Sequence, residues 1–101
     1  GTEIMSRAAR DRAIEFQCES DGEDPIMGTP IRFALGYELN CNAFPMGPNP
    51  KAFGHWGAGG SFGFGDIETG LAFGYTPNYM HPNMELGPRG TDLVRQVFNC
   101  L

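Results

Sequence analysis

Alternating apolar and polar positions between residues 31 and 40 give the clearest strand pattern of the chain. Apolar side chains occupy every second position there, which is the period of a strand with one buried face. They are Ile31, Phe33, Leu35, Tyr37 and Leu39. We therefore predict a strand over 31–40, followed by an irregular, proline-rich connection at 42–50 and a second strand that begins near Ala52.

A β-hairpin is predicted between Ser61 and Tyr75. Segments 61–65 and 71–75 carry apolar residues at alternate positions, and the five residues 66–70 between them have the composition of a turn. Two alternating segments joined by a short loop are typical of a hairpin. The strand near Ala52 would precede this hairpin.

Both ends of the chain show helical spacing. Apolar residues between Glu3 and Ile14 recur at helical intervals, with Thr2 as the predicted N-cap. Apolar residues over 93–101 recur in the same way, behind Pro88 or Thr91 as the start of a second helix. Turn-forming residues fill 19–30 and 77–88, which are predicted to be loops.

The order helix, strand, strand, strand, helix predicts an α+β fold. Because no βαβ crossover is expected, the sheet should be antiparallel, with the N- and C-terminal helices on one face. The 101 residues form at most one domain, and a domain of this size buries barely two-thirds of its unfolded surface, by a rough estimate. A further segment of chain would stabilise it.

Charge and composition exclude several classes of function. The net charge is -5 and the seven basic residues are scattered, so no nucleic-acid partner is expected. No apolar run approaches the ~18 residues that span a bilayer, so we expect a soluble chain without a membrane partner. An odd number of widely spaced cysteines argues against a disulfide framework and for a reducing, cytoplasmic compartment.

A zinc site is the alternative use of these cysteines. It would combine them with the two histidines, and the five candidate ligands are Cys18, Cys41, Cys100, His55 and His81. Their spacing lacks the paired Cys-x-x-Cys arrangement of structural zinc sites. We therefore expect ordinary cysteines, no metal and no cofactor.

A serine triad can be read from the glycine-rich segment. Gly-x-Ser-x-Gly at 59–63 is followed by Asp66 and His81, in the chain order of the α/β-hydrolases. That motif needs a strand that turns sharply into a helix, and a dinucleotide-binding glycine loop has the same requirement. Here Ser61 is followed by alternating Phe and Gly, which favour extended chain. Five residues from Ser61 to Asp66 also leave no room for the usual intervening elements. We treat Ser61 as an ordinary strand residue.

Three segments together resemble a known family. They are Arg-Phe-Ala-Leu-Gly-Tyr at 32–37, Phe-Gly-His-Trp-Gly-Ala-Gly-Gly-Ser at 53–61, and the turn and return strand at 66–75. From about Pro25 onward the chain resembles the C-terminal part of the serine β-lactamase-like hydrolases. The likeness is greatest to the family VIII type of esterase, related to class C β-lactamases and penicillin-binding proteins. The closing helix matches in position.

The resemblance implies a role for residues 55–59. The family acts through Ser-x-x-Lys, Tyr-x-Asn and a Lys-Thr-Gly-like triplet on an edge strand, and esterases often carry His-x-Gly or Trp-x-Gly as the triplet. His55, Trp56 and Gly57 would be this triplet, with His55 orienting groups or helping to move a proton. Ala58 would give a main-chain N–H to the oxyanion hole, and Gly59 would also lie on the substrate side. Residue types alone favour a packed His–Trp pair instead.

The other two family motifs are missing from the chain. Lys51 is the only lysine and follows no serine at the required spacing, and no tyrosine is followed two residues later by asparagine. By resemblance, 1–101 is a partial β-lactamase-related domain that is inactive alone and needs the N-terminal portion of the same domain. The complete enzyme would form an acyl-enzyme from a small ester or amide substrate, with ester hydrolysis favoured. The alternative is a non-catalytic α+β binding module that folds cooperatively as a monomer.

Overall fold

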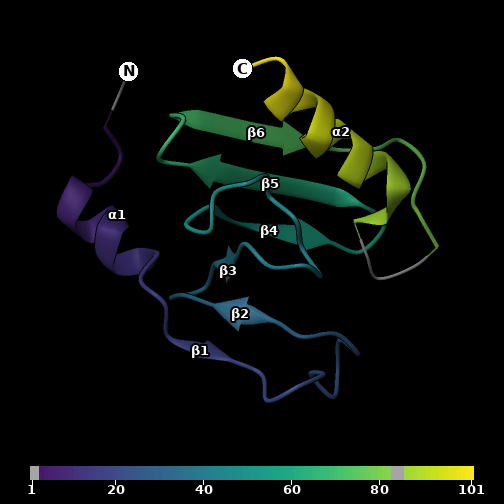
Figure 1. Cartoon of the computed structure of the whole chain (residues 1–101), viewed down its shortest axis with the longest axis horizontal. Helices are drawn as coiled ribbons and strands as arrows, with labels where there is room; N and C mark the ends of the chain where they lie inside the picture. Colours follow the sequence, from purple (N-terminus) through teal and green to yellow (C-terminus); the bar gives the residue numbers. More distant parts are fainter. Residues whose placement is uncertain (1–2, 83–85) are drawn as a thin grey trace.

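A computed structural model describes residues 3–82 and 86–101. Its elements are, in chain order, α1 (Arg7–Ala13), β1 (Cys18–Glu19), β2 (Arg32–Phe33), β3 (Glu38–Leu39), β4 (Phe53–Gly57), β5 (Ser61–Asp66), β6 (Leu71–Tyr75) and α2 (Gly87–Asn99). The strands form one six-stranded sheet in the order β1-β2-β3-β4-β5-β6, and each pairs antiparallel with the next (Figure 1). The predicted α+β fold with an antiparallel sheet is confirmed.

The three long strands β4, β5 and β6 form the centre of the structure, as the predicted hairpin requires. Phe64 pairs with Gly54 on β4 and with Phe73 on β6. Residues paired in this way share a face of the sheet. One face therefore carries Gly54, Trp56, Phe62, Phe64, Asp66, Leu71, Phe73 and Tyr75, and the other carries Phe53, His55, Gly57, Ser61, Gly63, Gly65, Ala72 and Gly74.

The hydrophobic core lies on the Phe62 and Phe64 face. Helix α2 and the connection between β3 and β4 lie over this face in Figure 1. The buried cluster contains Phe44, Met46, Ala52, Phe62, Phe64, Leu86 and Val94. Phe98 of α2 stacks on Phe64, with ring centroids 6.1 Å apart. On the opposite face His55, Gly63, Ala72 and Gly74 are exposed, so this part of the face is not covered by the described chain.

The predicted strand over 31–40 is wrong, because the chain reverses within it. Strands β2 and β3 are the two arms of a tight hairpin, with Phe33 paired to Glu38. The Ala34 N–H donates to the Tyr37 carbonyl at 2.8 Å, and Gly36 has φ 85°. Glycine adopts this left-handed conformation without a steric penalty, so it allows a turn inside an alternating pattern. Strand β1, which the sequence pattern did not predict, adds to the outer edge of β2.

Helix α1 is shorter than the predicted 3–14. It begins at Arg7 with Ser6 as N-cap, whose Oγ accepts the Ala9 N–H at 3.2 Å. The predicted cap Thr2 lies outside the described residues. The helix has no buried residue and stands beside the sheet in Figure 1. It is therefore held by few tertiary contacts.

Helix α2 begins as the sequence pattern predicts. Pro88 lies in its first turn, after Gly87 with φ 71°. Proline is favoured at the start of a helix because its missing N–H would be unpaired there anyway. Residues 83–85 of the predicted 77–88 loop lie outside the described residues.

Candidate functional site

The second half of β4 lies at an open edge of the sheet. Strand β3 has only two residues, and they pair with Phe53 and Gly54. Residues 55–57 therefore have β5 as their partner on one side and no described strand on the other. The predicted triplet His55, Trp56 and Gly57 occupies this edge.

His55 projects from the face of the sheet opposite α2 and is exposed. Its cross-strand partner is Gly63, which has no side chain to crowd the imidazole. His55 Nδ1 lies 2.6 Å from the Trp56 carbonyl oxygen. Because a carbonyl oxygen only accepts, this contact assigns the proton to Nδ1 and leaves Nε2 of the neutral ring as an acceptor. Such a nitrogen can take up or return a proton.

A tight turn joins β4 to β5 and carries Ala58 and Gly59. Gly59 and Gly60 have φ values of 91° and 94°, which favour glycine at both positions. The Gly60 N–H donates to the Gly57 carbonyl at 3.1 Å, and the His81 N–H donates to the Gly59 carbonyl at 2.8 Å. Among the turn and loop hydrogen bonds of the described residues, none uses the N–H of the exposed Ala58.

Gly57 lies on the His55 face, next to Ser61 on β5. A Cβ at position 57 would lie 2.8 Å from the Ser61 hydroxyl oxygen. Real Cβ atoms essentially never come this close to another heavy atom, so a larger residue at position 57 would require the Ser61 hydroxyl to move. The predicted site residues thus follow one another along the β4 edge and the turn, with His55 and Ala58 exposed, Trp56 and Gly57 partly buried, and Gly59 buried.

Glu38 is a charged residue close to this edge that the sequence analysis did not single out. The alternating pattern placed it on the polar side of the predicted strand, yet it is only 2 % exposed. Burial raises the pKa of its carboxyl group, against the opposing effects of nearby His55 and of the side-chain and main-chain N–H groups of Trp56. A glutamate inside an alternating pattern gives no signal of burial when the pattern conceals a turn.

The alternative triad of Ser61, Asp66 and His81 is not assembled. Ser61 and Asp66 lie at opposite ends of β5, about 16 Å apart for five residues of strand, and their side chains leave opposite faces. Asp66 is buried and accepts hydrogen bonds from the Asn49 side chain, from the Glu68 N–H at 2.9 Å and from the Thr69 hydroxyl at 2.9 Å. Burial alone would raise its pKa, but these hydrogen bonds outweigh burial and lower it. Asp66 therefore has the role of a turn-stabilising residue.

The residues considered as metal ligands are dispersed. Cys18, Cys41 and Cys100 are free cysteines, and two of them are exposed. Within 3–82 and 86–101 there is no group of three or more His, Cys, Asp or Glu side chains placed to hold a metal ion. No helix in the described part of the chain is long and apolar enough to cross a membrane.

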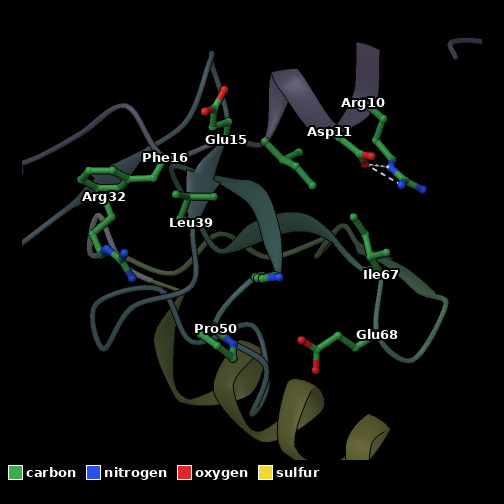
Figure 2. Close-up of a pocket in the computed structure, with 11 residues that line it drawn as sticks. Arg10, Asp11, Glu15, Phe16, Arg32, Leu39, Pro50, Ile67 and Glu68 are labelled. Atoms are coloured by element: carbon green, nitrogen blue, oxygen red, sulfur yellow. Dashed lines mark hydrogen bonds and ion pairs between the residues drawn. The ribbon is translucent and has the colours of Figure 1, made fainter. Parts of the chain in front are cut away.

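A separate open pocket of about 700 Å³ lies between α1 and the sheet (Figure 2). Its apolar side chains include Ile14, Phe16, Leu39 and Ile67, and both signs of charge surround them. None of the predicted site residues lines it. The pocket and the β4 edge are therefore different surfaces.

Known proteins that are similar to this chain include two solved structures and one sequence relative, while no protein-family model matches it. The crystal structure of a family VIII carboxylesterase superposes on 100% of the chain with a TM-score of 0.90 and 39% identity, and 27% of that structure is covered. EstA from Arthrobacter nitroguajacolicus Rue61a superposes on 95% of the chain with a TM-score of 0.80 and 28% identity, with 25% of EstA covered.

The sequence relative is the esterase/beta-lactamase LipL of Mycobacterium tuberculosis. It is 45% identical over 49 residues, which are 48% of this chain and 10% of LipL. The chain thus spans about a quarter of each solved structure and matches a tenth of LipL. The resemblance to the serine β-lactamase-like hydrolases is confirmed.

Proposed function

We propose that this chain is the C-terminal part of a serine hydrolase of the carboxylesterase type, in which His55, Trp56 and Gly57 form the third motif. The observation that carries the proposal is the superposition of the entire chain on a family VIII carboxylesterase at 39% identity. In this proposal the remaining part of the domain provides the serine nucleophile and its base. The substrate is a small ester, and the reaction passes through an acyl-enzyme.

His55 is proposed to orient or exchange a proton near the nucleophile. Its exposure on the uncovered part of the face opposite α2 supports this role, because a group that moves protons must reach the reacting atoms. The contact from Nδ1 to the Trp56 carbonyl supports it further, since Nε2 of the neutral ring is then an acceptor. The neighbouring Gly63 leaves room for a substrate beside the ring.

Ala58 is proposed to donate its main-chain N–H to the oxyanion that forms during acyl transfer. The absence of a described turn or loop partner for this N–H supports the proposal, because an oxyanion-hole donor must be free of internal acceptors. The turn hydrogen bonds made by the Gly57 and Gly59 carbonyls hold the main chain on either side of Ala58. A donor of this kind lowers the barrier only when a nucleophile is also present, so the chain alone is proposed to be inactive.

A chimaera provides the test. The aligned quarter of the family VIII carboxylesterase is replaced by this chain, and hydrolysis of a short-chain p-nitrophenyl ester is measured. We expect activity in the chimaera, and a loss of about 10²- to 10⁴-fold in kcat/KM for His55→Ala, the usual range for a general acid–base group. The matched control is Glu68→Gln, on the exposed turn after β5. A folded chimaera without activity, or equal rates for the two variants, would contradict the proposal.

The isolated chain gives a second test, with a fluorophosphonate probe that labels activated serines. We expect no increase in intact mass, because Asp66, the acid of the alternative triad, is engaged at the opposite end of β5 from Ser61. A stoichiometric adduct on Ser61 would contradict the proposed division of the site between this chain and the rest of the domain.

A further inference from the structure

Glu38 is a buried carboxyl group beside the edge that carries the proposed third motif. It is 2 % exposed, and its Oε2 has no hydrogen-bond partner among the described residues. Burying a carboxyl group is costly unless it interacts with other polar groups. The polar groups that act on it here belong to Trp56 and His55. Glu38 therefore interacts with two residues of the proposed third motif.

The main chain of Trp56 explains this arrangement. In an antiparallel ladder, the N–H and the C=O of one residue point to the same neighbouring strand. Glu38 pairs with Gly54, two residues before Trp56, and the chain turns away from β4 at residues 34–37. The main-chain N–H and C=O of Trp56 at this edge therefore have no partner in a described strand. Glu38 and Trp56 lie on the same face of the sheet, so the carboxylate can reach the N–H groups of Trp56, which lower its pKa. The Trp56 C=O lies 2.6 Å from His55 Nδ1.

We propose that Glu38 is a positioning residue for His55: its carboxylate replaces the missing strand at the Trp56 N–H and so fixes the carbonyl that holds the imidazole. The side-chain N–H of Trp56 also favours the ionised form of this carboxyl group and so lowers its pKa. Glu38 does not touch the substrate, because its side chain lies on the core face of the sheet. The effect of Glu38 on catalysis rests on the proposed function, whereas its effect on the position of His55 does not.

The opposed influences on Glu38 agree with this role. Burial raises its pKa, while the N–H groups of Trp56 and the imidazole of His55 favour the ionised form. His55 is the titratable group that acts on Glu38 in the described structure.

Nitrogen NMR on the chain itself tests the positioning. The imidazole ¹⁵N spectrum contains only His55 and His81, and a His81→Gln variant assigns the two rings. We expect His55 in the Nδ1–H form. Glu38→Gln keeps an acceptor of the same shape and should retain that form. Glu38→Met keeps the volume without an acceptor and should convert His55 to a mixture of tautomers. An unchanged tautomer in Glu38→Met would overturn the proposal.

A measurement without any substitution complements this one. The Trp56 amide proton lies at an edge without a strand, so it should exchange with solvent rapidly unless Glu38 holds it. We expect protection comparable to that of the paired amides of β4. Exchange as fast as that of an exposed loop amide would overturn the proposal even if no Glu38 variant folds.

The esterase chimaera separates this inference from the proposed function. We expect Glu38→Met to lower kcat by about 10- to 100-fold with KM nearly unchanged, because a small misplacement of a catalytic group costs this much. Glu38→Gln should restore most of the rate. If the chimaera is inactive while the tautomer and exchange results hold, the proposed function fails and the positioning role stands. An active chimaera that tolerates Glu38→Met would instead overturn the role in catalysis.

Discussion

Gly54 is the position at which the close approach of β4 and β5 can be tested most directly. A Cβ built at this residue would lie 2.7 Å from Phe64 Cα and 2.8 Å from Phe64 Cβ. These atoms belong to the main chain and to the first atom of a buried side chain, so they cannot move aside without shifting β5. Gly54→Ala should therefore disturb the two strands that build the proposed site.

The expected cost follows from the kind of obstruction. Overpacking a well-packed core costs about 1–3 kcal/mol, and obstruction by main-chain atoms places Gly54→Ala near ~3 kcal/mol. The matched control is Gly74→Ala on β6, where no heavy atom lies within 4 Å of the added Cβ and φ is not positive. That change should be neutral or stabilise the chain by up to ~1 kcal/mol, because alanine loses less backbone entropy on folding.

Urea unfolding followed by the fluorescence of Trp56, the single tryptophan, measures both changes. A loss of ~3 kcal/mol corresponds to a fall in Tm of roughly 12–24 °C, since each kcal/mol shifts a domain of this size by about 4–8 °C. If Gly54→Ala and Gly74→Ala unfold at the same urea concentration, the described approach of β4 to β5 is refuted.

Two further predictions concern the core and the turn after β5. Met46 is 0 % exposed, so Met46→Ala should lower the free energy of unfolding by about 2–5 kcal/mol. The control is Met80→Ala, at a side chain that is 66 % exposed, which should change this free energy by less than about 0.5 kcal/mol. Equal urea midpoints for the two variants would contradict the assignment of Met46 to the core. The pKa of Asp66 is lowered in the folded state, so its contribution to stability is complete above the unfolded pKa of ~3.9 and is lost as the pH falls through the folded value. Asp66→Asn should weaken the dependence of the unfolding free energy on pH below about pH 4, and an unchanged acid dependence in urea titrations from pH 2 to pH 7 would count against it.

Local spacing was sufficient for several elements of the fold. The alternating segments of 61–75 form the β5–β6 hairpin, the strand expected near Ala52 is β4, and Pro88 lies in the first turn of α2. Each of these depends on the period of a strand or helix and on residues with a fixed backbone preference. Such features act within a few neighbouring residues, so a sequence pattern contains them. The succession of strands without a crossover helix then requires an antiparallel sheet.

Local sequence patterns predicted only part of the candidate site. The glycines around the turn at 57–61 and the neighbouring histidine and tryptophan are visible in the sequence, and the resemblance to a known family gave them a role. The failure of the Ser61, Asp66 and His81 motif could also be argued from local pattern, since extended chain after the serine excludes the required turn. The structure adds that Asp66 is engaged on the opposite face.

Tertiary structure decided the burial of Glu38 and the open edge beside Trp56. Residues 31–40 alternate as a single strand would, but the positive φ of Gly36 reverses the chain and leaves β3 with two residues. Glu38 is thereby turned into the core instead of toward solvent. An alternating pattern predicts the face on which each residue lies only within one uninterrupted strand. Where the strand ends, and which groups it leaves without partners, depends on contacts between segments far apart in the chain.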